Sequence, residues 1–136
     1  MRLTCIDCFS GAGGLSIGLT RSGFDIIFSF DNDALCVETQ HRNPKYFDHQ
    51  VLCTGIDKML GGGLLKTTGL DPGQLDLLAG GPPCQGFSVQ RIGADEDDRN
   101  DLVLQYVQLI EEVRPKFFLM ENVRGLSGKS TYILHQ

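Results

Sequence analysis

The sequence predicts one α/β domain built on a parallel sheet of about five strands, with helices on both faces. Short apolar runs alternate along the chain with stretches of helical periodicity, which is typical of parallel strands joined by helical crossovers. The chain has 136 residues, of which 41% are hydrophobic and 21% charged, so it can bury the core of one domain. No internal repeat or low-complexity tract favours another architecture.

The first half of the chain is expected to supply three strands and two helices. LTCIDCF, residues 3–9, is an apolar strand that leads into a helix over residues 13–22. DIIFSF, residues 25–30, predicts a second strand, followed by a helix over residues 33–41. HQVLCT, residues 49–54, is a weaker third strand.

The second half is expected to add two strands and two helices. Residues 57–66 have helical character, although three consecutive glycines interrupt it. LDLLAG, residues 75–80, predicts a fourth strand, and KFFLMEN, residues 116–122, a fifth. Between them, residues 101–113 predict an amphipathic helix. Its apolar face consists of Leu102, Val103, Tyr106, Val107, Ile110 and Val113.

Charge and hydropathy limit the possible functions. A net charge of −5 leaves the chain without the cations that a nucleic-acid binder needs, so a polyanionic partner requires cations from elsewhere. No apolar run reaches the roughly 20 residues of a membrane span, and a charged residue interrupts the N-terminal apolar stretch at once. We expect a soluble protein that is cytoplasmic in a bacterium or associated with its nucleoid, and not secreted.

The cysteines indicate reduced thiols. Their number, five, is odd, and they lack the dense spacing of a disulfide scaffold. Cys5 and Cys8 form a C-x-x-C pair, but it lies in an apolar run, and residues three apart in a strand face opposite sides of the sheet. The sequence therefore favours strand packing over a zinc site, and we predict no bound metal.

A glycine-rich loop follows the first strand. In DCFSGAGGLS, Gly11, Gly13 and Gly14 permit a tight turn and the close approach of a ligand. Asp31 follows the second strand, 20 residues after Gly11, at the distance where an acidic side chain accepts hydrogen bonds from ribose. Ser16 stands where a dinucleotide fingerprint has its third glycine. The pattern predicts a nucleoside site, with a purely structural turn as the alternative.

GGPPCQGFS, residues 80–88, follows the fourth strand. Proline fixes its own backbone and restricts the residue before it, so Pro82 and Pro83 hold Cys84 with little freedom at the edge where strands end. A thiol on a rigid loop is a candidate nucleophile, whereas a structural cysteine is usually buried within an element.

Glu121 ends the fifth strand. A carboxyl in that position is expected to be partly withdrawn from water, which would raise its pKa and let it act as a proton donor. The alternative is an ion pair with Arg99 or Arg124. A thiol, an acid and a nucleoside site on neighbouring strand ends together indicate an active site.

These segments resemble a known family. FSGAGGLS, GGPPCQGFS and ENVRGL, in this order and spacing, are similar to the amino-terminal half of a cytosine-5 DNA methyltransferase, and DDRNDL (residues 97–102) also fits. The resemblance covers essentially the whole chain. It implies a Rossmann-like S-adenosylmethionine-dependent methyltransferase fold that is incomplete at one edge, and an enzyme of the restriction-modification type.

The resemblance also implies a mechanism. The Cys84 thiolate adds to carbon 6 of cytosine, Glu121 hydrogen-bonds or protonates ring nitrogen 3, and carbon 5 takes the methyl group of S-adenosyl-L-methionine, leaving S-adenosyl-L-homocysteine. The substrate is double-stranded DNA whose cytosine is flipped out of the helix. Pro82, Pro83 and Asn122 are expected to line the pocket for the base.

For the cofactor, the family pattern falls on Phe9, Ser10, Gly11, Gly13, Gly14, Leu15, Asp31, Asn32 and Ile56. Asp31 corresponds to the ribose position and Asn32 to a position that often covers adenine. Where the family has an aspartate that accepts from the adenine amino group, this chain has Gly55. Weak cofactor binding is therefore expected, unless Asp57 takes the role.

The resemblance predicts one partial catalytic domain, residues 1–136, without a target-recognition domain. We expect a subunit of a split enzyme or a truncated form, whose open fifth strand pairs with a second chain or with further strands. Three alternatives stay open: a tRNA cytosine-5 methyltransferase, an inactive cofactor-binding remnant, and a nicotinamide dehydrogenase, which would give the PPCQ loop no role.

Overall fold

The computed structural model of the chain describes residues 1–83 and 100–122. Within these residues, five strands form one sheet in which every neighbouring pair is parallel, in the order β3-β2-β1-β4-β5. The strands are β1 (Thr4–Cys8), β2 (Asp25–Asp31), β3 (Gln50–Cys53), β4 (Leu77–Gly80) and β5 (Phe117–Met120). The predicted α/β class and five-stranded parallel sheet are confirmed.

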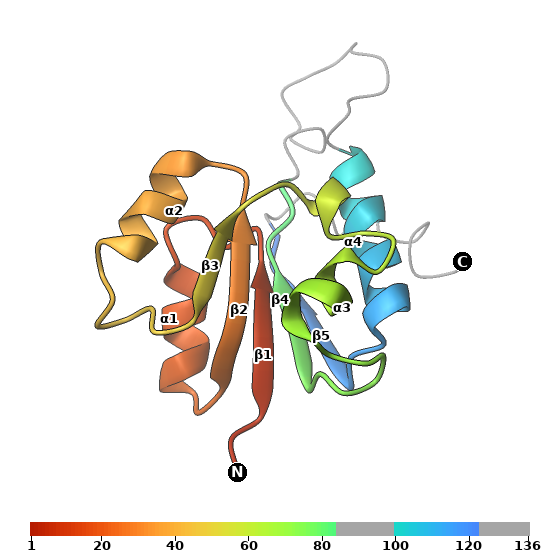
Figure 1. Cartoon of the computed structure of the whole chain (residues 1–136), viewed down its shortest axis with the longest axis horizontal. Coiled ribbons are helices and arrows are strands. Elements are labelled where there is room, and N and C mark those ends of the chain that lie inside the picture. Colours follow the sequence, from red (N-terminus) through yellow and green to blue (C-terminus); the bar gives the residue numbers. More distant parts are fainter. Residues whose placement is uncertain (84–99, 123–136) are drawn as a thin grey trace.

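Helices cover both faces of the sheet (Figure 1). One face carries α1 (Gly14–Arg21) and α2 (Ala34–His41), and the other carries α3 (Gly63–Thr68) and α4 (Asn100–Val113). A short 3-10 helix, η1 (Ile56–Lys58), precedes α3. Because all strands are parallel, their carboxyl ends meet at one edge, which we call the rim. None of the described helices is both long and apolar enough to cross a membrane.

The alternation of side chains along β1 explains the two cores. Cys5 packs with Leu19 of α1, whereas Ile6 and Cys8 pack with Tyr106 of α4. The two thiols therefore face opposite sides of the sheet, as their spacing predicts. Burial raises the pKa of Cys5 to about 12 and holds that of Cys8 well above its ordinary value. Both are consequently poor nucleophiles.

The predicted amphipathic helix is α4. Its buried residues are Val103, Tyr106, Leu109 and Val113. The buried face therefore includes Leu109, which the sequence pattern omitted, while Val107 is only half-buried. The Tyr106 hydroxyl donates toward the carbonyl oxygens of Leu78 and Leu119, at 3.1 and 3.0 Å, and so joins β4 to β5.

The helical stretch expected over residues 57–66 is interrupted at its glycines, as the sequence predicts, and forms two separate short helices. Gly61 and Gly62 have φ values of 62° and 82°, and the chain divides there into η1 and α3. Glycine adopts this left-handed conformation at little cost, whereas side chains disfavour it. The backbone N–H groups of both glycines donate to the Glu112 carboxylate of α4 at 3.2 Å. The backbone N–H groups at the break between the two helices are therefore hydrogen-bonded.

The strand β5 forms one edge of the sheet. It pairs with β4, and no other described strand lies beside it. Its side chains Phe117, Phe118 and Leu119 are 69%, 56% and 40% exposed. An apolar edge of this kind is normally paired or covered in proteins. The predicted open edge is therefore present within the described part of the chain.

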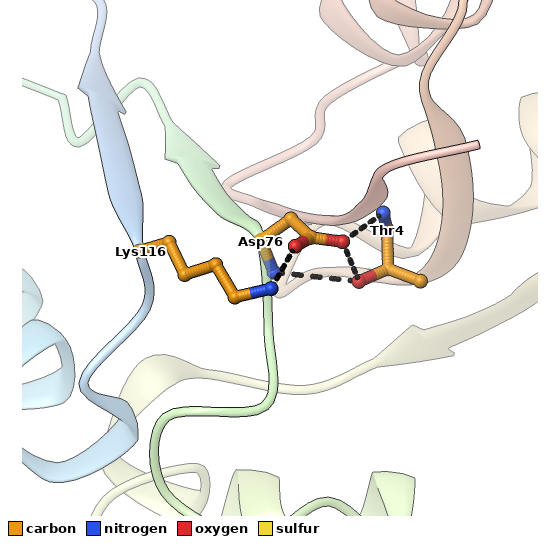
Figure 2. A network of polar contacts seen from close by, with 3 residues as sticks. All are labelled: Thr4, Asp76 and Lys116. Carbon is orange, nitrogen blue, oxygen red and sulfur yellow. Dashed lines mark hydrogen bonds and ion pairs between the residues drawn. The ribbon is translucent and has the colours of Figure 1, made fainter. Parts of the chain in front are cut away.

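A polar cluster ties together the beginnings of three strands (Figure 2). Asp76, just before β4, accepts hydrogen bonds from the backbone N–H and the hydroxyl of Thr4 in β1, at 2.8 and 3.0 Å. Lys116, just before β5, donates to the other carboxylate oxygen at 2.6 Å. The hydrogen bond from Lys116, followed by those from Thr4, lowers the pKa of Asp76 to about 2. The ionised carboxylate therefore stabilises the end of the sheet opposite the rim.

Asp7 is a second, buried carboxyl group near the other end of β1. The Ser16 hydroxyl in α1 donates to Asp7 Oδ2 at 2.6 Å, which anchors the first turn of the helix to the sheet. Asp7 Oδ1 has no hydrogen-bond partner among the described residues. Burial raises the pKa of Asp7 to about 6, against the effect of the Ser16 hydrogen bond. Folding therefore favours the protonated form of this group.

Asp7 should lower the stability of the chain as the pH rises from about 4 to about 6. An unfolded aspartate has a pKa of about 3.9, so in this window the folded chain binds more protons than the unfolded chain, and raising the pH favours unfolding. The shift corresponds to about 3 kcal/mol of unfolding free energy. Urea unfolding of the wild type and of Asp7→Asn across this range should show the wild type losing that amount relative to the variant.

The comparison isolates Asp7 because Asp76 and His49 titrate in both proteins. Asp76, with its lowered pKa, contributes stability above about pH 4 that is lost as the pH falls toward 2. This loss of stability below about pH 4 should be the same in Asp7→Asn as in the wild type. A difference between the two proteins that stays constant from pH 4 to 7 would contradict the assignment.

Candidate functional site

A pocket of about 280 Å³ lies at the rim. It is lined by Phe9, residues 30–32, residues 54–57, Pro83, Leu102 and Gln105. These residues end β2, follow β1, β2, β3 or β4, or lie in the first turns of α4. The arrangement is typical of open parallel sheets, which bind ligands beyond the carboxyl ends of their strands.

Hydrogen bonds and packing fix the turn after β1. Gly11 has a φ of 53°, and its N–H donates to Asp31 Oδ2 at 2.8 Å. Gly13 has a φ of 93°, and its N–H donates to the Ser10 carbonyl at 2.9 Å. A Cβ on Gly13 would lie 2.2 Å from the Phe47 ring. Glycine is therefore required at residue 13 by both conformation and space.

Asp31 joins three segments of the rim. Its Oδ2 accepts from Gly11, and its Oδ1 accepts from the backbone N–H of Asp33 at 2.8 Å. Asp33 in turn caps α2, because its Oδ1 accepts from the N–H of Leu35 at 2.8 Å. A carboxylate offers about four acceptor positions. Asp31 can therefore hold its loops and still accept hydrogen bonds from a ligand.

Aromatic rings form one wall of the pocket. The Phe9 ring lies 6.3 Å from the Phe30 ring and 6.2 Å from the Tyr106 ring, measured between centroids. Phe9 has a φ of 57°, which is unfavourable for a residue with a side chain and costs on the order of 1–3 kcal/mol. The surrounding contacts therefore hold Phe9 in a strained conformation beside the pocket.

The space beside Gly55 is occupied by another residue's carboxylate. A Cβ on Gly55 would lie 2.5 Å from Asp57 Oδ1. The other oxygen, Oδ2, is 3.4 Å from Lys58 Nζ, in an exposed ion pair. Both Gly55 and Asp57 line the pocket. Asp57 thus places an acceptor where a side chain on residue 55 would otherwise begin.

Gly80 and Gly81 form the stem of the proline–cysteine loop. A Cβ on Gly80 would lie 2.9 Å from the Tyr106 ring, and a Cβ on Gly81 would lie 3.1 Å from Glu121 Oε2. The Glu121 N–H donates to the Gly80 carbonyl at 2.9 Å. The structure therefore brings the Glu121 carboxylate to the start of the loop. Cys84 itself lies outside the described residues.

The expected burial of Glu121 is wrong. Its side chain is exposed, because it follows the edge strand β5 and faces Gly81, which has no side chain to cover it. Arg99 and Arg124, the alternative ion-pair partners, lie outside the described residues. Among the described residues, Glu121 is therefore placed beside the loop stem without being withdrawn from water.

The predicted cofactor residues divide into two groups. Four line the pocket: Phe9, Asp31, Asn32 and Ile56. The others belong to the turn and helix next to it. Ser10 and Gly13 are buried and Gly11 is half-buried, all three within the turn. Gly14 and Leu15 begin α1, and Leu15 packs against the core on that face of the sheet.

The predicted base-pocket residues lie at the same edge. Pro82 is buried and Pro83 is exposed in the loop stem, while Asn122 is half-buried after β5. The sequence interpretation missed two lining residues of α4, Leu102 and Gln105. Helical periodicity already marked Leu102 as inward-facing, but nothing in the sequence singled out Gln105. Gln105 Oε1 is buried without a hydrogen-bond partner among the described residues.

Comparisons with known proteins agree with this geometry. A sequence model of the family "C-5 cytosine-specific DNA methylase" matches residues 3–136. Type II methyltransferase M.XorII of Xanthomonas oryzae pv. oryzae is 38% identical over 133 residues, covering 96% of this chain and 31% of that protein. Type II methyltransferase M.AgeI of Thalassovita gelatinovora is 39% identical over 125 residues, covering 92% and 29%.

A solved structure supports the same relationship. The chain matches a DNA modification methyltransferase encoded within a prophage of E. coli, with a TM-score of 0.77 and 33% identity, covering 97% of this chain and 35% of that one. The chain thus spans about a third of the length of each of these relatives. On the family match over nearly its whole length, the chain belongs to the C-5 cytosine-specific DNA methylase family.

Proposed function

We propose that this chain carries the cofactor site and the nucleophile of a DNA (cytosine-5-)-methyltransferase of the restriction-modification type. The observation that supports this best is the pocket that bears Asp31 and includes Pro83 of the loop stem leading to Cys84, a stem that Glu121 also contacts at Gly81. The strands before these groups, β2, β4 and β5, all end at the rim. A nucleoside-type site therefore adjoins the stem of the loop that carries Cys84 in the sequence, and Glu121 contacts the same stem.

The residues present fit S-adenosyl-L-methionine, which supplies an activated methyl group when bound. Asp31 keeps acceptor capacity for the ribose hydroxyls. Phe9 and the Ser10–Gly11 turn border the methionine portion, and Asn32 and Ile56 flank the adenine. Gly13, Gly14 and Leu15 support this site from the turn and the start of α1.

Asp57 takes the acceptor role for the adenine amino group in this chain. The resemblance places an aspartate at residue 55, where this chain has glycine, and Asp57 Oδ1 lies 2.5 Å from the position of a Cβ there. The carboxylate is supplied from two residues further along the chain, and Gly55 leaves room for it. Cofactor affinity is therefore retained although residue 55 is glycine rather than aspartate.

For catalysis, the flipped cytosine binds beside Pro82, Pro83 and Asn122. The Cys84 thiolate forms a bond to carbon 6 while Glu121 donates a hydrogen bond or proton to ring nitrogen 3, so that electron density increases at carbon 5. Carbon 5 then takes the methyl group. Loss of the carbon 5 proton to a base and breakage of the bond to sulfur restore the aromatic ring and the free thiol.

DNA binding requires cations from outside this chain. It contains 12 Lys and Arg residues against 17 Asp and Glu residues, so it repels a polyanion on balance. A second chain or a further segment with a basic recognition surface therefore completes the enzyme. The apolar edge of β5 offers a place for additional strands.

The nucleophile assignment can be tested by covalent trapping. DNA with 5-fluorocytosine at the target should become attached to Cys84 in an active enzyme that contains this chain, because fluorine cannot leave carbon 5 as a proton does. Peptide mapping should locate the adduct in the wild type and in Cys53→Ser, a control at an exposed thiol. Cys84→Ser should form no adduct. An adduct that survives Cys84→Ser would refute the assignment.

The Asp57 assignment can be tested by moving the carboxylate. Asp57→Ala should weaken the binding of S-adenosylhomocysteine about tenfold, on the order of one hydrogen bond to a charged group. Gly55→Asp alone should not improve binding, because its Cβ meets Asp57 Oδ1. The double variant Gly55→Asp/Asp57→Ala should recover most of the affinity, and the exposed Asp71→Ala serves as the control. Calorimetry showing tighter binding for Gly55→Asp alone would contradict the assignment.

A further inference from the structure

A buried polar network lies behind the glycine turn, on the side away from the pocket. Gln40 of α2 is completely buried, which is uncommon for a glutamine in a short helix. Its Nε2 lies 2.7 Å from the Gly11 carbonyl and 2.9 Å from the Ser10 hydroxyl. Its Oε1 lies 3.3 Å from the Ser29 hydroxyl in β2, and that hydroxyl lies 2.9 Å from His49 Nε2.

The chemistry of the partners determines the direction of every hydrogen bond. The Gly11 carbonyl can only accept, so the Gln40 amide must present its NH₂ group to the turn. The Ser29 hydroxyl then donates to Gln40 Oε1, and His49 carries a hydrogen on Nε2 and donates to Ser29. Burial lowers the pKa of His49 and favours its neutral form. All polar atoms of the Gln40 amide are therefore satisfied.

The network holds the peptide groups of the turn from one side while Asp31 holds them from the other. The Gly11 N–H donates to Asp31 Oδ2 at 2.8 Å, and the Gly11 carbonyl accepts from Gln40. Two residues further along, packing adds a constraint at Gly13. A Cβ on Gly13 would lie 2.2 Å from the Phe47 ring and 3.3 Å from Gln40 Cγ. The turn has little freedom to move away from the pocket.

We infer that Gln40 is a positioning residue: its buried amide, braced by Ser29 and His49, holds the Ser10–Gly11 turn in the shape that binds the cofactor. A role in core packing alone would be met better by an apolar residue, because burying an amide brings little net stability even when it is paired. The inference rests on the proposed function for its ligand. Its claim about the shape of the turn is independent of the ligand.

The test compares Gln40→Met, Gln40→Glu and Val113→Ala in the full chain. Methionine keeps the length of the side chain but donates no hydrogen bond. Val113 is buried at the end of α4 away from the rim, so Val113→Ala destabilises the core without touching the network. Gln40→Met should shift the NMR amide signal of Gly11 and raise the Kd for S-adenosylhomocysteine about tenfold, roughly the effect of one lost hydrogen bond. Val113→Ala should lower the Tm and leave both readouts unchanged.

Gln40→Glu adds a pH-dependent rescue. The ionised carboxylate would face the Gly11 carbonyl and bind poorly, whereas its protonated form can donate one hydrogen bond to that carbonyl. The Kd ratio of Gln40→Glu to wild type should therefore fall as the pH is lowered, while the ratio for Gln40→Met should not. The ratio cancels the titration of Asp7, which both proteins share, and the Gln40→Met ratio measures how much of the pH dependence comes from His49, which Ser29 joins to residue 40.

Two results separate this inference from the proposed function. If the wild type does not bind S-adenosylhomocysteine, the proposed cofactor site is wrong, and the Gly11 signal alone decides the inference. A Gly11 signal that shifts in Gln40→Met and not in Val113→Ala supports it. An unchanged Gly11 signal in Gln40→Met, with or without ligand binding, overturns it.

Discussion

The hydrogen bond from the Gly11 amide to the Asp31 carboxylate is the interaction on which the candidate site depends. It connects the loops that follow the two neighbouring strands β1 and β2, at the rim where all strands of the parallel sheet end. The same carboxylate accepts from Asp33, whose side chain starts α2. Loss of this carboxylate would therefore remove hydrogen bonds from both the glycine turn and the start of α2.

The two faces of the sheet support the site in different ways. Beneath α1 and α2 the support is polar: Ser16 anchors the start of α1 to Asp7, and Gln40 holds the Ser10 hydroxyl and the Gly11 carbonyl of the turn. Beneath α3 and α4, aromatic packing against Tyr106 forms the wall of the pocket. Hydrogen bonds restrict the directions in which the groups of the site point, and packing restricts the distances between them. Together they define a binding geometry more narrowly than either alone.

Strands, helices and parallel order could be predicted because their signals are local. Apolar runs and helical periodicity are contained within single segments of the sequence, as in α4. Gly11 and Asp31 are likewise separated by a recognisable spacing. The burial of individual side chains could not be predicted in this way, because it depends on contacts between elements that are distant in the sequence. Gln40 looks like any polar helix residue, and the exposure of Glu121 results from an edge strand and a facing Gly81. The contact of Asp57 with the space beside Gly55 depends on side-chain direction, which spacing does not give.

A crystal structure of the chain with S-adenosyl-L-homocysteine would test the central claim most directly. We expect the ribose hydroxyls on Asp31, the adenine between Asn32 and Ile56 with its amino group toward Asp57, and the amino acid portion over the Ser10–Gly11 turn. The turn should keep the conformation that it has without ligand. A ligand bound elsewhere on the chain, or in the pocket with its ribose away from Asp31, would contradict the account.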